Sequence, residues 1–144
     1  MIVGADDSGE AVDAAVAALQ ARGATVELLP QGQWPEVARA VGEAVAGGRA
    51  DFGVLACWTG TGTSIMANKV PGVRAALCWE PWIAEGARRW NDANVLVLSL
   101  KGTSAESAAA ILDAWLGVTT PDAGELANIA EIARYEAGRD ATDA

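Results

Sequence analysis

Residues 52–68 have the sequence FGVLACWTGTGTSIMAN, and this stretch decides the fold class. The apolar run Phe52–Ala56 predicts a strand that is buried on both faces, as strands of parallel sheets are. A turn with two glycines follows, and a helical pattern extends from about Thr63 to Asn68. A buried strand, a glycine-rich turn and a helix in direct succession indicate an α/β protein.

The same alternation continues along the whole chain. Further strands are predicted at Met1–Gly4, Thr25–Leu29, Val73–Leu77 and Asn94–Leu98. Further helices are predicted at Glu10–Arg22, Trp34–Ala46, Trp82–Trp90 and Ser104–Leu116. We therefore predict a Rossmann-like three-layer α/β/α fold with a five-stranded parallel sheet.

The chain of 144 residues fits one domain, spanning residues 1–144. Beyond Gly117, the turn Thr120-Pro121-Asp122 predicts the start of an extra C-terminal helix. We expect this helix over about residues 121–137, with a frayed tail over 138–144. Its apolar positions, such as Leu126 and Ile129, predict a face that packs on a second subunit, giving a homodimer, with a tetramer as the alternative.

Charge and composition exclude several classes of function. The net charge is −9, whereas nucleic-acid binding requires a basic surface, so we expect no nucleic-acid partner. The same charge opposes docking on an anionic membrane. No run approaches the ~20 apolar residues of a membrane span, and the acidic start shows no secretory pattern. We expect a cytoplasmic protein, in which Cys57 and Cys78 are reduced.

The chain contains no histidine, which is the usual proton carrier at neutral pH. Serine–histidine triads and histidine-containing metal sites are therefore excluded. Acid–base chemistry has to use Cys, Asp, Glu, Lys, Tyr, a hydroxyl or water. Asp6 and Asp7 are adjacent, but no third ligand accompanies them, so we expect neither a metal nor a cofactor.

Ligands of open α/β sheets bind beyond the carboxyl ends of the strands. The segment Cys57–Ser64 is expected there, with Ala5–Gly9 after the first strand and Lys101 after the fifth. Glycines and a helix start suit a loop that binds a phosphate, a carboxylate or an enediolate oxygen. A plain strand–helix turn with a buried cysteine explains the same residues, and the pattern alone leaves both interpretations open.

A family resemblance favours the first interpretation. Residues 57–62 (CWTGTG) and 64–78 (SIMANKVPGVRAALC) resemble the motif Cys-Gly-Thr-Gly-x-Gly-x-Ser-Ile-x-Ala-Asn-Lys of the ribose-5-phosphate isomerase B and galactose-6-phosphate isomerase family. Residues 91–96 (NDANVL) and 113–116 (DAWL) resemble later blocks of that family. The similarity extends over roughly residues 1–117.

The resemblance implies an aldose–ketose isomerase that works through an enediolate. It implies that Cys57 is the base and that Thr59 handles protons. It implies binding of a small carbohydrate substrate by residues that match the family: Asp6, Gly60, Gly62 and Asn91. We expect further contacts with the substrate from residues next to these or expected at the same edge: Asp7, Trp58, Thr61, Trp90 and Lys101.

The chain departs from the family at the site itself. Asp7 and Trp90 replace two histidines, Trp58 replaces the glycine after the cysteine, and Gln33-Trp34-Pro35 replaces Asp-Tyr-Pro. Glu125 and Ile129 align with two arginines that hold the substrate phosphate in the family. These departures leave three alternatives: a sugar phosphate or related polyhydroxy carbonyl substrate, a non-phosphorylated or otherwise unusual sugar, and a catalytically silent ligand-binding or regulatory protein.

Other side chains have simpler expectations. Trp34, Trp58, Trp79, Trp82 and Trp90 are expected near the carboxyl edge of the sheet. Trp58 and Trp90 either stack on a sugar there or pack against the protein. Trp115 is expected in the core, Cys78 as an inert buried thiol, and Arg88-Arg89 on a helix surface.

Overall fold

Five strands form one parallel sheet in the computed structural model, which describes residues 1–142. The strands are β1 (Ile2–Ala5), β2 (Glu27–Leu28), β3 (Gly53–Cys57), β4 (Ala75–Leu77) and β5 (Val95–Ser99). Their order is β2-β1-β3-β5-β4, and every neighbouring pair is parallel. The predicted five-stranded parallel sheet is confirmed.

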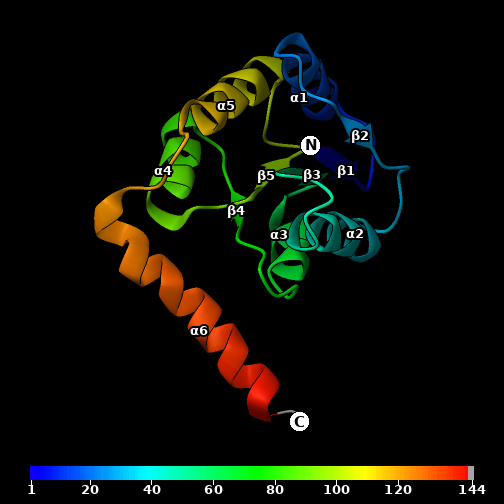
Figure 1. Ribbon diagram of the computed structural model, residues 1–144. Coiled ribbons are helices and arrows are strands. Elements are labelled where there is room, and N and C mark those ends of the chain that lie inside the picture. The colour runs from blue at the N-terminus through cyan, green and yellow to red at the C-terminus, as the bar shows by residue number, and fades with distance from the viewer. Residues whose placement is uncertain (143–144) are drawn as a thin grey trace.

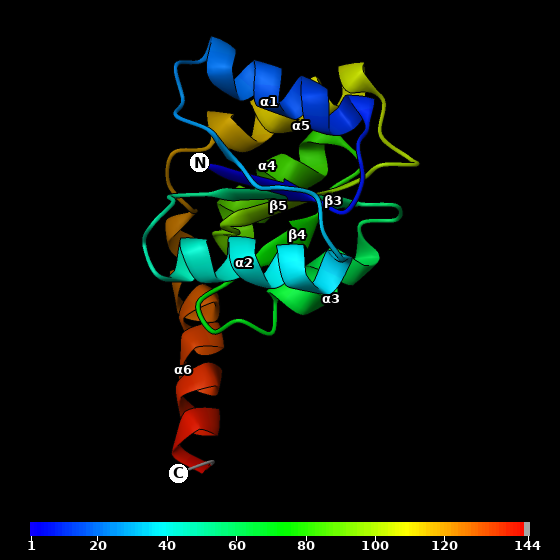
Figure 2. The same cartoon turned by 90° about the vertical axis from the view of Figure 1, so that its right-hand side faces the viewer.

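Helices cover both faces of this sheet (Figures 1 and 2). One layer consists of α1 (Glu10–Ala21), α4 (Pro81–Asn91) and α5 (Ala105–Gly117). The opposite layer consists of α2 (Trp34–Ala46) and α3 (Thr61–Ala67). A short 3-10 helix, η1 (Ala123–Glu125), leads into the extra C-terminal helix α6 (Leu126–Thr142). The three-layer prediction is therefore also confirmed.

Alternation along the strands divides the core in two. Val3, Val54 and Leu96 point into the layer with α1 and α5, where Trp115 is fully buried as predicted. Their chain neighbours Ile2, Leu55 and Val95 or Val97 point into the layer with α2. Successive side chains of a strand face opposite sides, so a sheet covered on both faces has apolar residues at every position.

The edge strand differs from its prediction. β2 spans Glu27–Leu28 rather than Thr25–Leu29, and both residues are exposed. It pairs only with β1, at the rim of the sheet, where one side of the backbone faces solvent. The prediction from apolar residues alone therefore made this strand too long.

The C-terminal helix also differs from its prediction. It begins at Leu126, after η1, and continues to Thr142, so a frayed tail starting at residue 138 is wrong as far as residue 142. Residues 143–144 lie outside the described part. Gly138 costs only about 1 kcal/mol within a helix, which does not suffice to end one rich in Ala and Glu.

Helix α6 projects from the body of the molecule (Figures 1 and 2). The carboxylate of Glu136 accepts a hydrogen bond from the Gly72 N–H at 3.0 Å, which ties the helix to the loop before β4. A groove of about 660 Å³ lies beside it, lined by residues that include Arg74, Asn91, Ile132 and Tyr135. Within residues 1–142, no helix combines the length and the apolar character required to cross a membrane.

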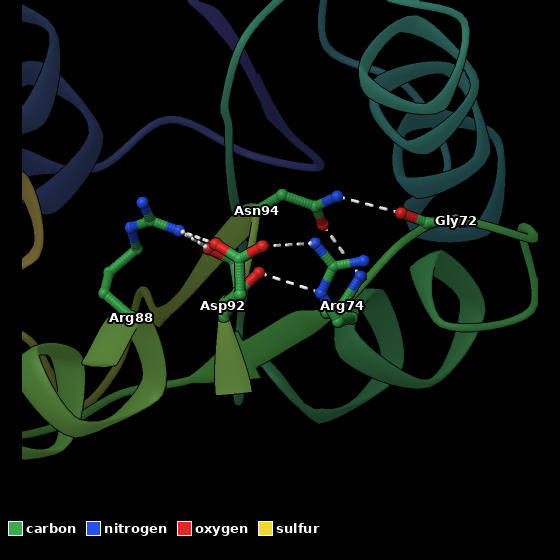
Figure 3. Close-up of polar contacts among 6 residues, drawn as sticks. Gly72, Arg74, Arg88, Asp92 and Asn94 are labelled. Atoms are coloured by element: carbon green, nitrogen blue, oxygen red, sulfur yellow. Dashed lines mark hydrogen bonds and ion pairs between the residues drawn. The ribbon is translucent and has the colours of Figure 1, made fainter. Parts of the chain in front are cut away.

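A polar network fixes the turn between α4 and β5 (Figure 3). The Asp92 carboxylate pairs with Arg88 at 2.9 Å and with Arg74 at 3.1 Å, and its backbone has a left-handed φ of 46°. Asn94 accepts from the Arg74 N–H and donates to the Gly72 carbonyl. The surface expectation for Arg88 is wrong: its side chain is only 5 % exposed, and its guanidinium lies over the Phe52 ring.

Candidate active site

Cys57 ends β3 at the centre of the sheet. The register aligns Ala56 with Ala5 of β1 and aligns Cys57 itself with Ser99 of β5. The chain turns toward one edge of the sheet after β1 and toward the other edge after β3. Their shared carboxyl end is therefore the point at which open α/β sheets bind ligands.

The loop after Cys57 requires glycine at position 60. Gly60 has a φ of 79°, and a Cβ there would lie 2.5 Å from Cδ1 of Leu77 and 3.0 Å from the Leu98 carbonyl oxygen. The Gly60 N–H bonds back to the Cys57 carbonyl at 3.2 Å. The resulting tight turn starts α3 directly beside the cysteine, two residues earlier than predicted.

Threonine hydroxyls line this turn. The Thr59 and Thr61 Oγ1 atoms are 2.6 Å apart, a short hydrogen bond between two exposed side chains. The hydroxyl of Thr63 donates to the Cys57 sulfur at 3.4 Å and lies 3.2 Å from the Gly60 carbonyl oxygen. Thr63 is fully buried, and Cys57 is 5 % exposed.

Asp6 lies next to Cys57, because its N–H donates to the Ala56 carbonyl at 3.3 Å. Its Oδ1 atom is buried without a hydrogen-bond partner. Burial raises the pKa of the Asp6 carboxyl above its usual range, backbone hydrogen bonds oppose this shift, and the charge of Asp7 adds to it. Asp7 itself is exposed, and its carboxylate accepts from the Ser8 N–H at 2.7 Å.

The loop after β5 forms the other side of the site. The Lys101 N–H donates to the Trp58 carbonyl at 3.0 Å, and the Ser99 hydroxyl donates to the same carbonyl at 2.9 Å. The Lys101 ammonium is 5.4 Å from the centre of the Trp58 ring, within the range of cation–π attraction. Trp58 is 62 % exposed, so this pair lies on the surface of the protein, one residue beyond Cys57.

Trp34 supports the loop from the side of α2. A Cβ on Gly62 would lie 3.1 Å from the Trp34 ring, so the indole packs directly on the glycine backbone. Gly62 thus serves close packing as well as any contact with a ligand. Trp34 was expected near this edge, and the structure assigns it this neighbour.

Trp90 and Asn91 lie at the opposite end of the sheet. They are the last residues of α4, which runs back from the carboxyl end of β4 to the amino end of β5. An eleven-residue helix rises about 16 Å, so its last turn cannot stay at the edge where it began. The expectation that Trp90 lies near the carboxyl edge is wrong, and one chain does not bring these two residues to Cys57.

The remaining titratable groups are engaged elsewhere. Cys78 is fully buried, its S–H donates to the Ala76 carbonyl, and burial raises the pKa of its thiol to about 12. Each arginine whose side chain is described is paired with a carboxylate: Arg22, Arg39, Arg49, Arg74, Arg88, Arg89 and Arg134. Among the described side chains of this loop, the Lys101 ammonium lies over the Trp58 ring and is in no ion pair.

The site therefore combines Asp6, the loop from Cys57 to Gly62, and Lys101. Sequence reasoning missed Thr63 and Ser99. Thr63 follows a glycine-rich turn and Ser99 ends a strand, positions at which a hydroxyl gives no distinctive signal. Within the part of the chain that the structure describes, no group of three His, Cys, Asp or Glu side chains is arranged to hold a metal ion.

Comparisons with known proteins identify the family of this chain. The model of the ribose/galactose isomerase family matches residues 1–132. The chain is 42 % identical over 131 residues to ribose-5-phosphate isomerase B of Escherichia coli, covering 86 % of this chain and 76 % of that one. It is 36 % identical over 124 residues to D-erythrulose-4-phosphate isomerase of Pectobacterium atrosepticum, covering 82 % of each chain.

Solved structures are similar over nearly the whole chain. A ribose-5-phosphate isomerase B from Clostridium thermocellum superposes with a TM-score of 0.90 at 32 % identity, covering 96 % of this chain and 97 % of that one. The fold, the motif and these relatives define the class of protein, an intramolecular aldose–ketose isomerase. The chain belongs to the ribose/galactose isomerase family.

Proposed function

We propose that this protein interconverts an aldose and a ketose through an enediolate, with Cys57 as the base. The observation that carries the proposal is the position of Cys57. Cys57 is the last residue of the central strand and precedes a glycine-containing loop, and its sulfur accepts a hydrogen bond from the Thr63 hydroxyl. Membership of a family of isomerases supports the same reaction.

The reaction requires two proton transfers at carbon. The Cys57 thiolate takes the proton from C2 of the open-chain aldose, and that electron pair forms a C1=C2 double bond as the carbonyl oxygen becomes an enediolate. The thiol then returns the proton to C1 while the C2 hydroxyl proton moves to O1. The product is the ketose, and no oxidant, metal or cofactor enters the balance.

The neighbouring groups have roles that match this chemistry. The Gly60 N–H is bonded to the Cys57 carbonyl, so the N–H groups of Thr61 and Gly62 in the first turn of α3 are the donors that stabilise the enediolate oxygen. The Thr59 hydroxyl, already hydrogen-bonded to Thr61, carries the proton between O1 and O2. Asp6 and Lys101 hold the hydroxyl and anionic parts of the substrate from either side of Cys57.

The proposed substrate is a sugar phosphate or a related polyhydroxy carbonyl compound. Lys101 offers one cation for a phosphate, and exposed Trp58 beside it offers a surface for a sugar ring. A non-phosphorylated sugar is the second candidate. It is favoured by the ion pairing of the described arginines, including Arg134 with Glu131, which leaves few cations for a dianion.

We also propose that the active form is at least a homodimer. Trp90 and Asn91 are separated from Cys57 of their own chain by the length of β3, about 13 Å. They can serve a Cys57 site only in a second copy of the chain. The exposed side chains Leu126, Ile132 and Tyr135 of α6 offer the apolar surface that such an assembly buries.

Proton exchange provides the most direct test of the reaction. The protein is incubated with a panel of aldoses and aldose phosphates in D₂O, and loss of the C2 proton signal is followed by NMR. An enediolate isomerase removes the C2 proton as the ketose forms, whether Cys57 returns that proton to C1 or first exchanges it with D₂O, so loss of the C2 signal together with formation of ketose is expected. Absence of both across the panel would favour a ligand-binding protein without catalysis.

Substitution of Cys57 tests the identity of the base. Cys57→Ala is expected to lower the exchange rate by the ~10²–10⁴ typical of a lost general base. Cys78→Ala is the matched control and is expected to keep its activity, because the Cys78 thiol is buried and its pKa is raised to about 12. Full activity in Cys57→Ala together with a large loss in Cys78→Ala would identify the other thiol as the base.

A further inference from the structure

Thr63 is a buried polar residue of the site that the family motif leaves unassigned. The motif has an unspecified residue at this position, between the second glycine and Ser64. The Thr63 side chain is fully buried in the first turn of α3. Its hydroxyl oxygen lies 3.4 Å from the Cys57 sulfur and 3.2 Å from the Gly60 carbonyl oxygen.

The hydroxyl has one proton and two acceptors within reach. A threonine hydroxyl donates one hydrogen bond and accepts up to two. When Cys57 is a thiol, the Thr63 proton can point to the Gly60 carbonyl while the S–H donates to Thr63. When Cys57 is a thiolate, rotation about one bond turns the same proton onto the sulfur. The side chain therefore has a partner in both protonation states, without backbone movement.

A hydrogen bond from Thr63 stabilises the thiolate of Cys57 more than the thiol. A hydrogen bond to an ionised acceptor is roughly twice as strong as one between neutral groups. A donor to the charged form of an acid favours ionisation, and the effect is larger where water is excluded. Cys57 is 5 % exposed, so little solvent competes with the Thr63 hydroxyl for the sulfur.

We infer that Thr63 is a positioning residue that holds the Cys57 sulfur in place and stabilises its thiolate through the hydroxyl. The role in catalysis depends on the proposed function of Cys57 as the base. The stabilisation of the thiolate does not depend on that function, because it is a property of the thiol and the hydroxyl alone. A purely structural Thr63 would bond only to the Gly60 carbonyl, as threonines in the first turn of a helix often do.

Titration of the Cys57 thiolate separates these two roles. The ultraviolet absorbance of the thiolate is followed against pH in the wild type, Thr63→Val and Thr63→Ser, with Cys57→Ala as the blank. Valine keeps the shape of threonine without the hydroxyl, whereas serine keeps the hydroxyl. We expect the titration midpoint of Thr63→Val to rise by roughly one pH unit, and Thr63→Ser to titrate within a few tenths of the wild type.

Kinetics provide the second measurement. With the substrate identified by proton exchange, the rising limb of the kcat–pH profile is expected to move to higher pH in Thr63→Val by the same amount. KM is expected to change little, because the Thr63 side chain is fully buried. Thr63→Ala, examined in the same way, gives a second hydroxyl-free variant if valine impairs folding, which circular dichroism reports.

The outcomes distinguish the two proposals. Folded Thr63→Val and Thr63→Ala variants that titrate like the wild type would overturn the role of Thr63, whatever their activity. A loss of activity without a shift in either pH profile would overturn it as well, because it would show a packing effect. Full proton exchange by Cys57→Ala would instead refute Cys57 as the base, while the absorbance titration would still decide whether Thr63 stabilises the thiolate.

Discussion

At Asp6 the chain keeps a carboxyl group where burial disfavours its charge. The Oδ1 atom has no hydrogen-bond partner, and desolvation raises the pKa above its usual value of about 3.9. A carboxyl group with a raised pKa binds its proton more tightly in the folded state than in the unfolded state. It therefore destabilises the fold as pH rises past its unfolded pKa, and this effect is fully developed above the folded pKa.

We predict that Asp6→Asn is more stable than the wild type at pH 7, with no advantage at about pH 3, where Asp6 is protonated in both states. Urea unfolding at the two pH values measures the difference. Asp51→Asn, which removes an exposed carboxylate at the other end of β3, is the control and is expected to show no such pH-dependent gain. An Asp6→Asn variant that is less stable at pH 7 would show that the carboxylate stabilises the fold.

The same variant is expected to bind substrate less well, because Asp6 lies beside Cys57 in the proposed site. A residue that lowers stability yet contributes to a site is a common compromise in enzymes. The tight turn at Gly60 was predictable from the motif, because a turn next to a strand end restricts the residue types that fit. The roles of Cys57 and Gly62 in a site remain predictions. The contact of Thr63 with Cys57 was not predictable, because it depends on which way a hydroxyl points.

At the level of elements, apolar periodicity predicted the sheet and the helices well where both faces are covered. β3 and β5 were predicted to within one residue at each end, since their side chains are buried on both sides. β2 was predicted too long because its place at the exposed edge of the sheet depends on the tertiary fold, which the apolar residues of the segment do not reveal. The position of Trp90 was missed because the direction of α4, and not its composition, decides which end of the sheet a residue reaches.

The turn after α4 depends on one carboxylate. Asp92 joins Arg88 to Arg74 and has a left-handed backbone conformation that asparagine also adopts with little strain (Figure 3). Asp92→Asn therefore keeps the backbone and removes the charge. We predict a loss of about 2–4 kcal/mol in the free energy of unfolding, because the Arg88 guanidinium then stays buried beside a neutral partner.

Urea unfolding checks this prediction. Glu85→Gln serves as the matched control, because Glu85 pairs with Arg89 on the exposed face of the same helix. That change is expected to cost less than about 1 kcal/mol, as exposed ion pairs do. Equal effects of the two substitutions would mean that the Asp92 network contributes no more to the free energy of unfolding than a surface ion pair does.

At the level of the whole molecule, α6 leaves apolar surface uncovered. Ile132 and Tyr135 are 40 % and 71 % exposed and line the groove beside β4. We predict that light scattering finds at least a dimer at micromolar concentration. Ile132→Glu is expected to weaken association roughly tenfold or more, because the new carboxylate would be buried.

Ala127→Glu is the control for that experiment. It adds the same charge at an exposed position about 140° around the helix from Ile132 and about 100° from Leu126. It is expected to leave association nearly unchanged. A wild-type chain that scatters as a monomer would contradict the dimer.

Charge across the molecule bears on the substrate. We predict weak or absent affinity for ribose 5-phosphate, because Glu125 and Ile129 stand where the family motif has two arginines and Arg134 is already paired. Two lost charge-assisted bonds amount to roughly 3–6 kcal/mol, or about 10²–10⁴ in affinity. The net charge of −9 also slows the approach of an anion.

Calorimetry with ribose 5-phosphate and with ribose measures the difference. Micromolar binding of the phosphate alone would contradict the prediction and would identify Lys101 or another cation as a sufficient phosphate ligand. A Lys101→Ala variant distinguishes these two sources. If it loses the phosphate affinity, the cation beside Trp58 is the ligand.

The arrangement of the six indoles decides what the intrinsic fluorescence of this protein reports. Trp115 is buried with its ring edge-on to Phe52, whereas Trp34, Trp58, Trp79, Trp82 and Trp90 are all at least 42 % exposed. We therefore expect the emission to be dominated by indoles in contact with water, and its maximum to shift little when the chain unfolds. A ligand that covers Trp58, next to Cys57, would shift part of that emission to shorter wavelength, so the protein carries its own optical probe for substrate binding at the proposed site.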